Sequence, residues 1–241
     1  MILSLEMKKL KRTGIFPAFL IGALLAGAFP IVNMLARAET FTSLPGEPLT
    51  ILAEANWQMM SMINLLVLLC GACMMYHTEF ADNGFQKMEM LPLSSAGLFF
   101  GKLVILLLLL ALMLLTETAS LAFCAGHWFP GSVFSLREYA LSAGFWFIAT
   151  LPTVILTLLI ASAFPNMWIS LGIGVILLFT VSVFPQDNPV LILFPFSTPY
   201  QILALARENG TVASLLTACA AEILALSGAE LLYQKIRRCF A

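Results

Sequence analysis

The sequence contains few charged residues. Only 10% of its 241 residues are Asp, Glu, Lys or Arg, whereas 61% are hydrophobic, and the mean hydropathy is +0.97. Soluble domains carry about 25% charged residues, so this chain could not cover its own surface in water. It also lacks a basic patch interleaved with aromatic residues, which argues against binding to nucleic acid. The composition therefore predicts an integral membrane protein.

Motifs that carry chemistry are also missing. The only Gly-Lys pair, Gly101-Lys102, lacks the glycine five residues earlier that a phosphate-binding loop needs. No Ser, His and Asp set and no Cys and His set gathers on one aqueous face. Cys70 and Cys73 lie within an apolar run, where two small buried side chains are a simpler interpretation than a metal or redox pair. The sequence predicts neither enzyme activity nor a metal site.

Six apolar segments are predicted to cross the membrane. Each reaches or approaches the roughly 20 apolar residues that span about 30 Å of hydrocarbon. They are residues 14–36, 57–77, 98–126, 136–164, 168–184 and 212–233. The first is longer than the core of a signal peptide and no clear cleavage site follows it, so we expect it to be retained. No repeat or long linker divides the chain, which predicts one all-α domain with six transmembrane helices over residues 1–241.

Lys and Arg set the predicted orientation. Nine fall in the segments on the N-terminal side of the membrane, namely Lys8, Lys9, Lys11, Arg12, Lys87, Lys102, Lys235, Arg237 and Arg238. Three fall on the other side, namely Arg37, Arg137 and Arg207. Cytoplasmic segments carry the excess of such residues, so both termini are expected in the cytoplasm.

Two segments outside the spans have unusual patterns. Residues 1–13 place Leu3, Met7 and Leu10 on one stripe and surround it with charged side chains, which is typical of a helix lying in the membrane interface. Residues 185–211 contain four prolines, too many for a normal span. We expect a proline-broken hairpin there, partly re-entrant on the extracytoplasmic side, and Arg37–Asn56 is expected to form a polar outer loop.

Residues 79–92 form the one long polar interruption between two apolar runs, and their pattern predicts an amphipathic cytoplasmic helix. Apolar side chains recur at helical spacing on one face of this helix, polar side chains occupy the other face, and Pro92 ends the helix. A helix in this place can show its polar face to a cytoplasmic partner. Its candidate contact residues are Glu79, Phe80, Asp82, Phe85, Gln86, Lys87 and Glu89.

Two acidic residues lie inside predicted spans. Glu117 falls in the third and Glu222 in the sixth, where an ionised carboxylate costs about 2.5–3.5 kcal/mol or more, so each should face protein or water. Ala218, Ala225 and Ala229 share one face with Glu222 and predict a helix-packing surface. The two carboxyl groups either line a substrate or proton path or serve as neutral packing residues, and the sequence favours neither reading.

With these residues placed, the chain resembles the permease subunits of type-2 ABC transporters, an exporter class. The resemblance rests on three features: the lead EMKKLKRTG, the segment EFADNGFQKMEMLPLSSAGLFFGK, and the proline-broken hairpin before the last span. Leu91-Pro92-Leu93-Ser94 followed by Gly101-Lys102 is similar to the pattern after that class's coupling helix. The resemblance implies that a separate ABC ATPase dimer binds ATP and magnesium, and that residues 79–92 dock into it. Phe80 and Phe85 would then anchor the helix to the spans.

A narrower resemblance concerns one branch of this class. The start E-x-x-K-x-K-R, the length and the segment PFSTPY are similar to the lantibiotic-immunity permeases. That resemblance implies a bacterial cytoplasmic membrane, a second related or identical permease, and an antimicrobial peptide expelled from the membrane. An ATP-independent carrier or channel that uses Glu117 and Glu222 is the alternative, although the inverted repeats typical of carriers are not detected. A membrane enzyme or scaffold is a third, and it would need clustered polar residues that the sequence lacks.

Overall fold

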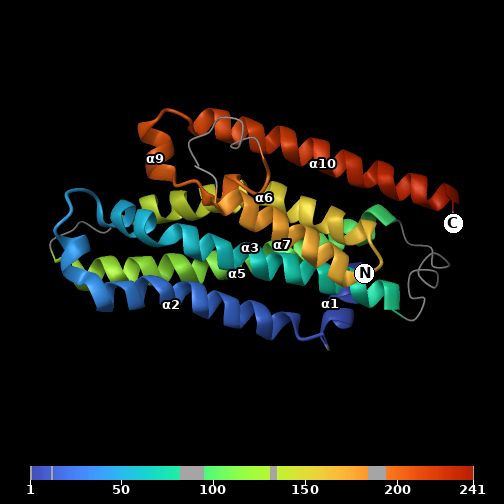
Figure 1. The fold of residues 1–241 in the computed structure, drawn as a ribbon, viewed down its shortest axis with the longest axis horizontal. Coiled ribbons are helices and arrows are strands. Elements are labelled where there is room, and N and C mark those ends of the chain that lie inside the picture. The colour runs from blue at the N-terminus through green and yellow to red at the C-terminus, as the bar shows by residue number, and fades with distance from the viewer. Residues whose placement is uncertain (1, 12, 82–94, 131–134, 184–193, 241) are drawn as a thin grey trace.

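The computed structural model describes residues 2–11, 13–81, 95–130, 135–183 and 194–240. Within these ranges it contains helices and no β-strand, and six long helices run side by side (Figure 1). The long helices are α2 (Ile15–Thr42), α3 (Pro48–Phe80), α5 (Ser95–Trp128), α6 (Leu136–Ala163), α7 (Met167–Val183) and α10 (Val212–Phe240). The short ones are α1 (Ile2–Leu10), α9 (Leu203–Glu208) and the 3-10 helix η2 (Thr198–Tyr200).

Five of the long helices, α2, α3, α5, α6 and α10, are long and apolar enough to cross a membrane. The sixth, α7, is also apolar but has only 17 residues. At 1.5 Å per residue it is about 25 Å long, near the lower limit for a span. The prediction of a multi-pass, all-α membrane protein is confirmed. The sixth crossing stays a prediction.

The outer loop predicted over Arg37–Asn56 is wrong. α2 continues to Thr42 and α3 begins at Pro48, so only residues 43–47 separate the two helices. Pro48 occupies the first turn of α3. Proline suits this position because backbone N–H groups in the first turn have no acceptor within the helix, so the absence of one costs no hydrogen bond. A kink at Arg37 marks the place where α2 departs from regular geometry. The polar residues of this stretch therefore do not mark the ends of the two helices.

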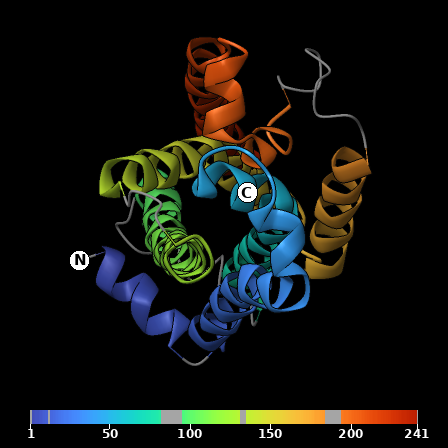
Figure 2. The same ribbon diagram turned by 90° about the vertical axis from the view of Figure 1, so that its left-hand side faces the viewer.

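Helix α3 is the centre of the bundle, since it packs against α2, α5, α6 and α7 (Figure 2). Met60, Leu68 and Ala72 on it are fully buried. Helix α2 approaches α3 closely at Gly71. A Cβ atom at this position would lie 2.7 Å from the ring of Phe19 on α2. Such small residues permit the close helix approach that drives association within membranes.

The second half of the proline-rich segment folds back into the bundle. Phe196 is fully buried, and the carbonyl of Pro199 accepts hydrogen bonds from Trp57 Nε1 at 2.9 Å and Ser61 Oγ at 3.1 Å, both on α3. A carbonyl freed from helical bonding is thus satisfied by protein, as a re-entrant segment requires. The first part of the predicted hairpin, residues 185–193, lies outside the described residues.

The ends of the helices divide between the two ends of the bundle. Helix α1 and the last turns of α10 lie at the same end (Figure 1). The end of α3 and the start of α5, which flank residues 82–94, lie there too. The opposite end carries residues 43–47, the end of α5 and the start of α6.

Candidate functional site

Four charged side chains from three helices form a buried ion-pair network at the end that α1 and the last turns of α10 share. Glu6 and Lys9 come from α1, Glu79 from the last turn of α3, and Lys102 from the second turn of α5. Lys102 Nζ lies 2.6 Å from Glu79 Oε1 and 3.1 Å from Glu6 Oε2. Lys9 Nζ lies 2.7 Å from Glu6 Oε1 and 3.0 Å from Glu79 Oε1. Each cation therefore bridges the same two carboxylates.

The network is shielded from its surroundings. The side chains of Glu6 and Lys102 are each 1% exposed, that of Glu79 is 6% exposed, and only Lys9, at 24%, reaches outward. The ring of Tyr76 lies 5.2 Å from Lys102 Nζ and adds a cation–π contact. Two positive charges balance two negative ones, which is the condition under which a buried ion cluster is tolerated.

The face of α1 that packs against the bundle differs from the predicted apolar stripe. Glu6 and Leu10, one helical turn apart, are each 1% exposed and pack toward α5, whereas Leu3 and Met7 are each 42% exposed. The expected apolar stripe is thus only partly the buried one, and the buried face also carries Glu6, which pairs with Lys102 on α5. Leu3 and Met7 remain available to the membrane interface, where an amphipathic helix buries such side chains.

Lys9 is held in its charged form by the network. Desolvation by burial lowers its pKa, but the hydrogen bond to Glu6 and the charges of Glu79 and Glu6 outweigh it, so the pKa lies above the ordinary value of 10.5. A raised pKa means that this interaction stabilises the fold below pH 10.5 and is lost as the pH rises beyond it. Lys9 therefore carries its positive charge throughout the physiological pH range.

The predicted partner-contacting residues divide into two groups. Glu79 and Phe80 belong to the last turn of α3, so the predicted amphipathic helix does not begin with them. The carboxylate of Glu79 faces Lys9 and Lys102, and Phe80 is half-buried against the core beside the ring of Tyr76. The other predicted contacts, Asp82, Phe85, Gln86, Lys87 and Glu89, lie outside the described residues, and their role stays a prediction.

Glu117 is fully buried between helices. One of its oxygens, Oε2, accepts a hydrogen bond of 3.0 Å from Asn64 Nδ2 on α3. Its other oxygen, Oε1, and the amide oxygen of Asn64 have no hydrogen-bond donor among the described residues. A second buried amide pair, Asn33 Nδ2 to Asn56 Oδ1 at 2.8 Å, links α2 to α3. Glu117 thus joins α5 to the central helix.

Glu222 lies in a different environment on α10. The residue is half-buried, and neither of its oxygens accepts a hydrogen bond from a described residue. On the predicted packing face around it, Ala218 is half-buried whereas Ala225 and Ala229 are exposed. A carboxyl group absent from the predictions, Glu230, is fully buried and accepts a hydrogen bond of 3.0 Å from Ser162 Oγ on α6. No hydrogen bond joins Glu117 to Glu222 in the described part of the chain.

Sequence reasoning missed the ion-pair network as a unit. The sequence pattern places Glu6 and Lys9 on a helix in the membrane interface, and it shows Lys102 only as a positive charge and as part of a family pattern. A signal was present, since a lysine that enters an apolar run one turn after Leu98 must find a carboxylate or reach water. All four side chains of the network pair with one another. The network can therefore hold together the three helices that contribute to it.

One comparison with known proteins identifies a family. Residues 2–181 of the 241-residue chain match the family described as ABC-2 family transporter protein. The match covers α1, all four residues of the ion-pair network and Glu117. No curated protein matches the chain. The matched region is more than half of the sequence, and the chain therefore belongs to the ABC-2 family of transporter proteins.

Proposed function

We propose that this chain, a non-catalytic membrane subunit of an ABC transporter, receives the movement of a separate ATPase through residues 82–94 and passes it to the spans through the ion-pair network. Permeases of this family normally work with an ATPase partner. The observation that carries the proposal is the position of the network. It ties α1, α3 and α5 together where the chain leaves α3 and where it re-enters α5.

The geometry of the network supports such a role. Glu79 precedes residues 82–94 by one turn or less, and Lys102 follows them in the second turn of α5. Because these two side chains pair at 2.6 Å, the two helix ends are fixed to each other and to α1. A force applied to the intervening segment would then move three helices as one body. In this proposal Asp82, Gln86, Lys87 and Glu89 meet the ATPase, and Phe80 and Phe85 anchor the segment to the spans.

For the substrate, we propose a lipophilic molecule that is expelled from the membrane. The bundle offers exposed apolar side chains along α2, including Leu20, Leu24 and Leu35, and few charges. Those surfaces suit lateral entry from lipid better than a polar channel would. An antimicrobial peptide, as in lantibiotic immunity, is the substrate that the sequence resemblance favours. The corresponding assembly is an ATPase dimer with two permeases in a bacterial cytoplasmic membrane, with six spans in this chain and both termini in the cytoplasm.

Reversing charge in the proposed docking segment should separate the chain from its ATPase. We expect Asp82→Lys combined with Glu89→Lys to reduce recovery of the ATPase with the affinity-purified chain by about tenfold or more, because like charges are placed against a surface that accepts acidic side chains. Membrane insertion and yield of the chain should not change. Quantitative mass spectrometry of the purified complex, isolated from native membranes, measures the ratio.

A matched control is Glu208→Lys, an exposed acidic residue that ends helix α9, and α9 lies at the opposite end of the bundle (Figure 1). It should leave recovery of the ATPase unchanged. An intact complex in the double variant would contradict the docking role of residues 82–94. Equal loss in the control would show that the effect is not specific to this segment.

A further inference from the structure

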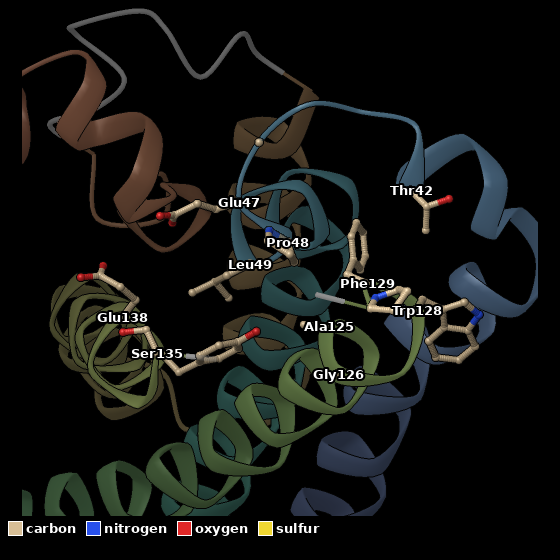
Figure 3. A pocket seen from close by; sticks show the side chains of 13 residues that line it. Thr42, Glu47, Pro48, Leu49, Ala125, Gly126, Trp128, Phe129, Ser135 and Glu138 are labelled. Carbon is tan, nitrogen blue, oxygen red and sulfur yellow. The ribbon is translucent and has the colours of Figure 1, made fainter. Parts of the chain in front are cut away.

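A second feature lies at the opposite end of the bundle from the ion-pair network. A cavity of about 780 Å³ opens between the end of α5, the start of α3 and the start of α6 (Figure 3). Its volume falls within the range of sites that bind drug-sized ligands, about 300–1,000 Å³. Neither the family match nor the coupling proposal gives this cavity a role.

The side chains around the cavity have one sign of charge. Glu47, the residue before α3, and Glu138, in the first turn of α6, contribute carboxylates. Neither lysine nor arginine lines the cavity in the described part of the chain. Three aromatic side chains, Trp128, Phe129 and Tyr139, also line the cavity, together with the aliphatic Leu49. Carboxylates and aromatic rings are the two groups that attract organic cations, by charge and by the cation–π interaction.

The two carboxylates are separated in space from two of the three aromatic side chains, whereas Tyr139 directly follows Glu138 in the chain. Glu47 and Glu138 lie on one side of the cavity, and Trp128 and Phe129 lie on the other (Figure 3). The ring of Trp128 is braced by edge contacts with His127 and Phe123, at centroid distances of 4.5 and 6.2 Å. A ligand that fills such a cavity carries its positive charge toward one end and an apolar or aromatic body at the other.

One carboxylate already binds a cationic group. Arg207, on α9, lies with its guanidinium 2.5 Å from Glu138 Oε2. Both partners are partly exposed, at 46% and 31%, so this ion pair is weak and a ligand can compete with it. Arg207 and the two carboxylates also line a small cavity, and this cavity shares Glu47, Leu49 and Glu138 with the large one. The ion pair with Arg207 therefore shows that the Glu138 carboxylate can bind a cationic group.

We propose that this cavity is a binding site for amphiphilic organic cations, either small lipophilic cations or basic side chains of a peptide with aromatic neighbours. All the residues named for this site come from this chain. The proposal rests on the proposed function only for the direction in which a bound ligand would move. Binding is therefore measured without the ATPase or ATP, and a negative result would leave the coupling proposal standing.

The test uses the full chain in lipid nanodiscs and isothermal titration calorimetry. One probe is tetraphenylphosphonium, its neutral counterpart is triphenylphosphine oxide, and a second probe is a short amidated peptide of alternating arginine and tryptophan. We expect the wild-type chain to bind at least one cationic probe at least about tenfold more tightly than the neutral compound. Binding of the phosphonium alone would identify a small-molecule site, and binding of the peptide would identify a peptide site.

Three variants locate the binding. Glu47→Gln combined with Glu138→Gln should weaken binding of the cation by about tenfold or more, because both carboxylate charges are removed. Arg207→Ala should strengthen it roughly twofold to fivefold, because Glu138 loses its competing partner. Glu39→Gln changes an exposed carboxylate of α2 that does not line the cavity and should have no effect. Equal affinity for the neutral compound, unchanged binding in the double variant, or weaker binding in Arg207→Ala would each overturn the proposal.

Discussion

Replacing Lys102 with methionine is expected to lower the free energy of unfolding by about 3–5 kcal/mol. The side chain is 1% exposed and lies between Glu6 and Glu79. Without it, two buried carboxylates share the single charge of Lys9, and one negative charge has no partner among the described residues. Unfolding of the purified chain in mixed micelles by increasing SDS, followed by circular dichroism, measures the change.

The effect should be reversible by a second substitution. In Lys102→Met combined with Glu6→Gln, the remaining Lys9 and Glu79 form a neutral pair, so a large part of the lost stability should return. Lys8→Met removes an exposed lysine from the same helix α1 and serves as the control with little expected effect. If Lys102→Met unfolds at the same SDS fraction as the wild type, the network does not hold the three helices together.

The second large effect is expected at Glu117. Glu117→Leu should destabilise the chain by about 1–3 kcal/mol, because the buried amide of Asn64 loses its partner. Glu117→Gln should be close to wild type, because its amide can both donate to Asn64 Oδ1 and accept from Asn64 Nδ2. The same SDS titration compares the two variants.

The comparison also decides between the two roles left open by the sequence. A packing residue permits Glu117→Gln to retain transport, whereas a proton or substrate site does not. Glu117→Leu combined with Asn64→Leu removes both partners and should recover stability relative to the single variant. A Glu117→Gln chain that is stable but inactive in transport would show that the carboxyl group itself takes part in the transport cycle.

Much of the fold is predictable because long apolar runs have few options in a membrane. Six predicted segments correspond to six long helices, although their ends differ. The polar residues before Trp57, for example, are helical from Pro48 onward, because hydrogen bonding inside a helix does not stop at the edge of the hydrocarbon. The amphipathic pattern of residues 1–13 predicts a helix, and α1 covers residues 2–10 of it, but the pattern does not show which face packs on α5.

The candidate site was less predictable because its members are distant in sequence. Glu6, Glu79 and Lys102 become neighbours only when α1 packs against the junction of α3 and α5. A single sequence shows that Lys102 needs a partner, but it offers several carboxylates and no means to choose among them. The same holds for Glu117, whose partner Asn64 is one of several polar residues on α3.

The segment between α3 and α5 is expected to contact the ATPase. Photo-crosslinking from benzoylphenylalanine placed at Gln86 in native cells, with mass spectrometry of the product, tests it most directly. We expect a crosslink to a separate nucleotide-binding polypeptide from position 86 and none from the same probe at Leu44, an exposed residue of the segment 43–47 at the opposite end of the bundle. Crosslinks from position 86 to lipid alone, or accessibility of that position to an impermeant reagent outside intact cells, would contradict it.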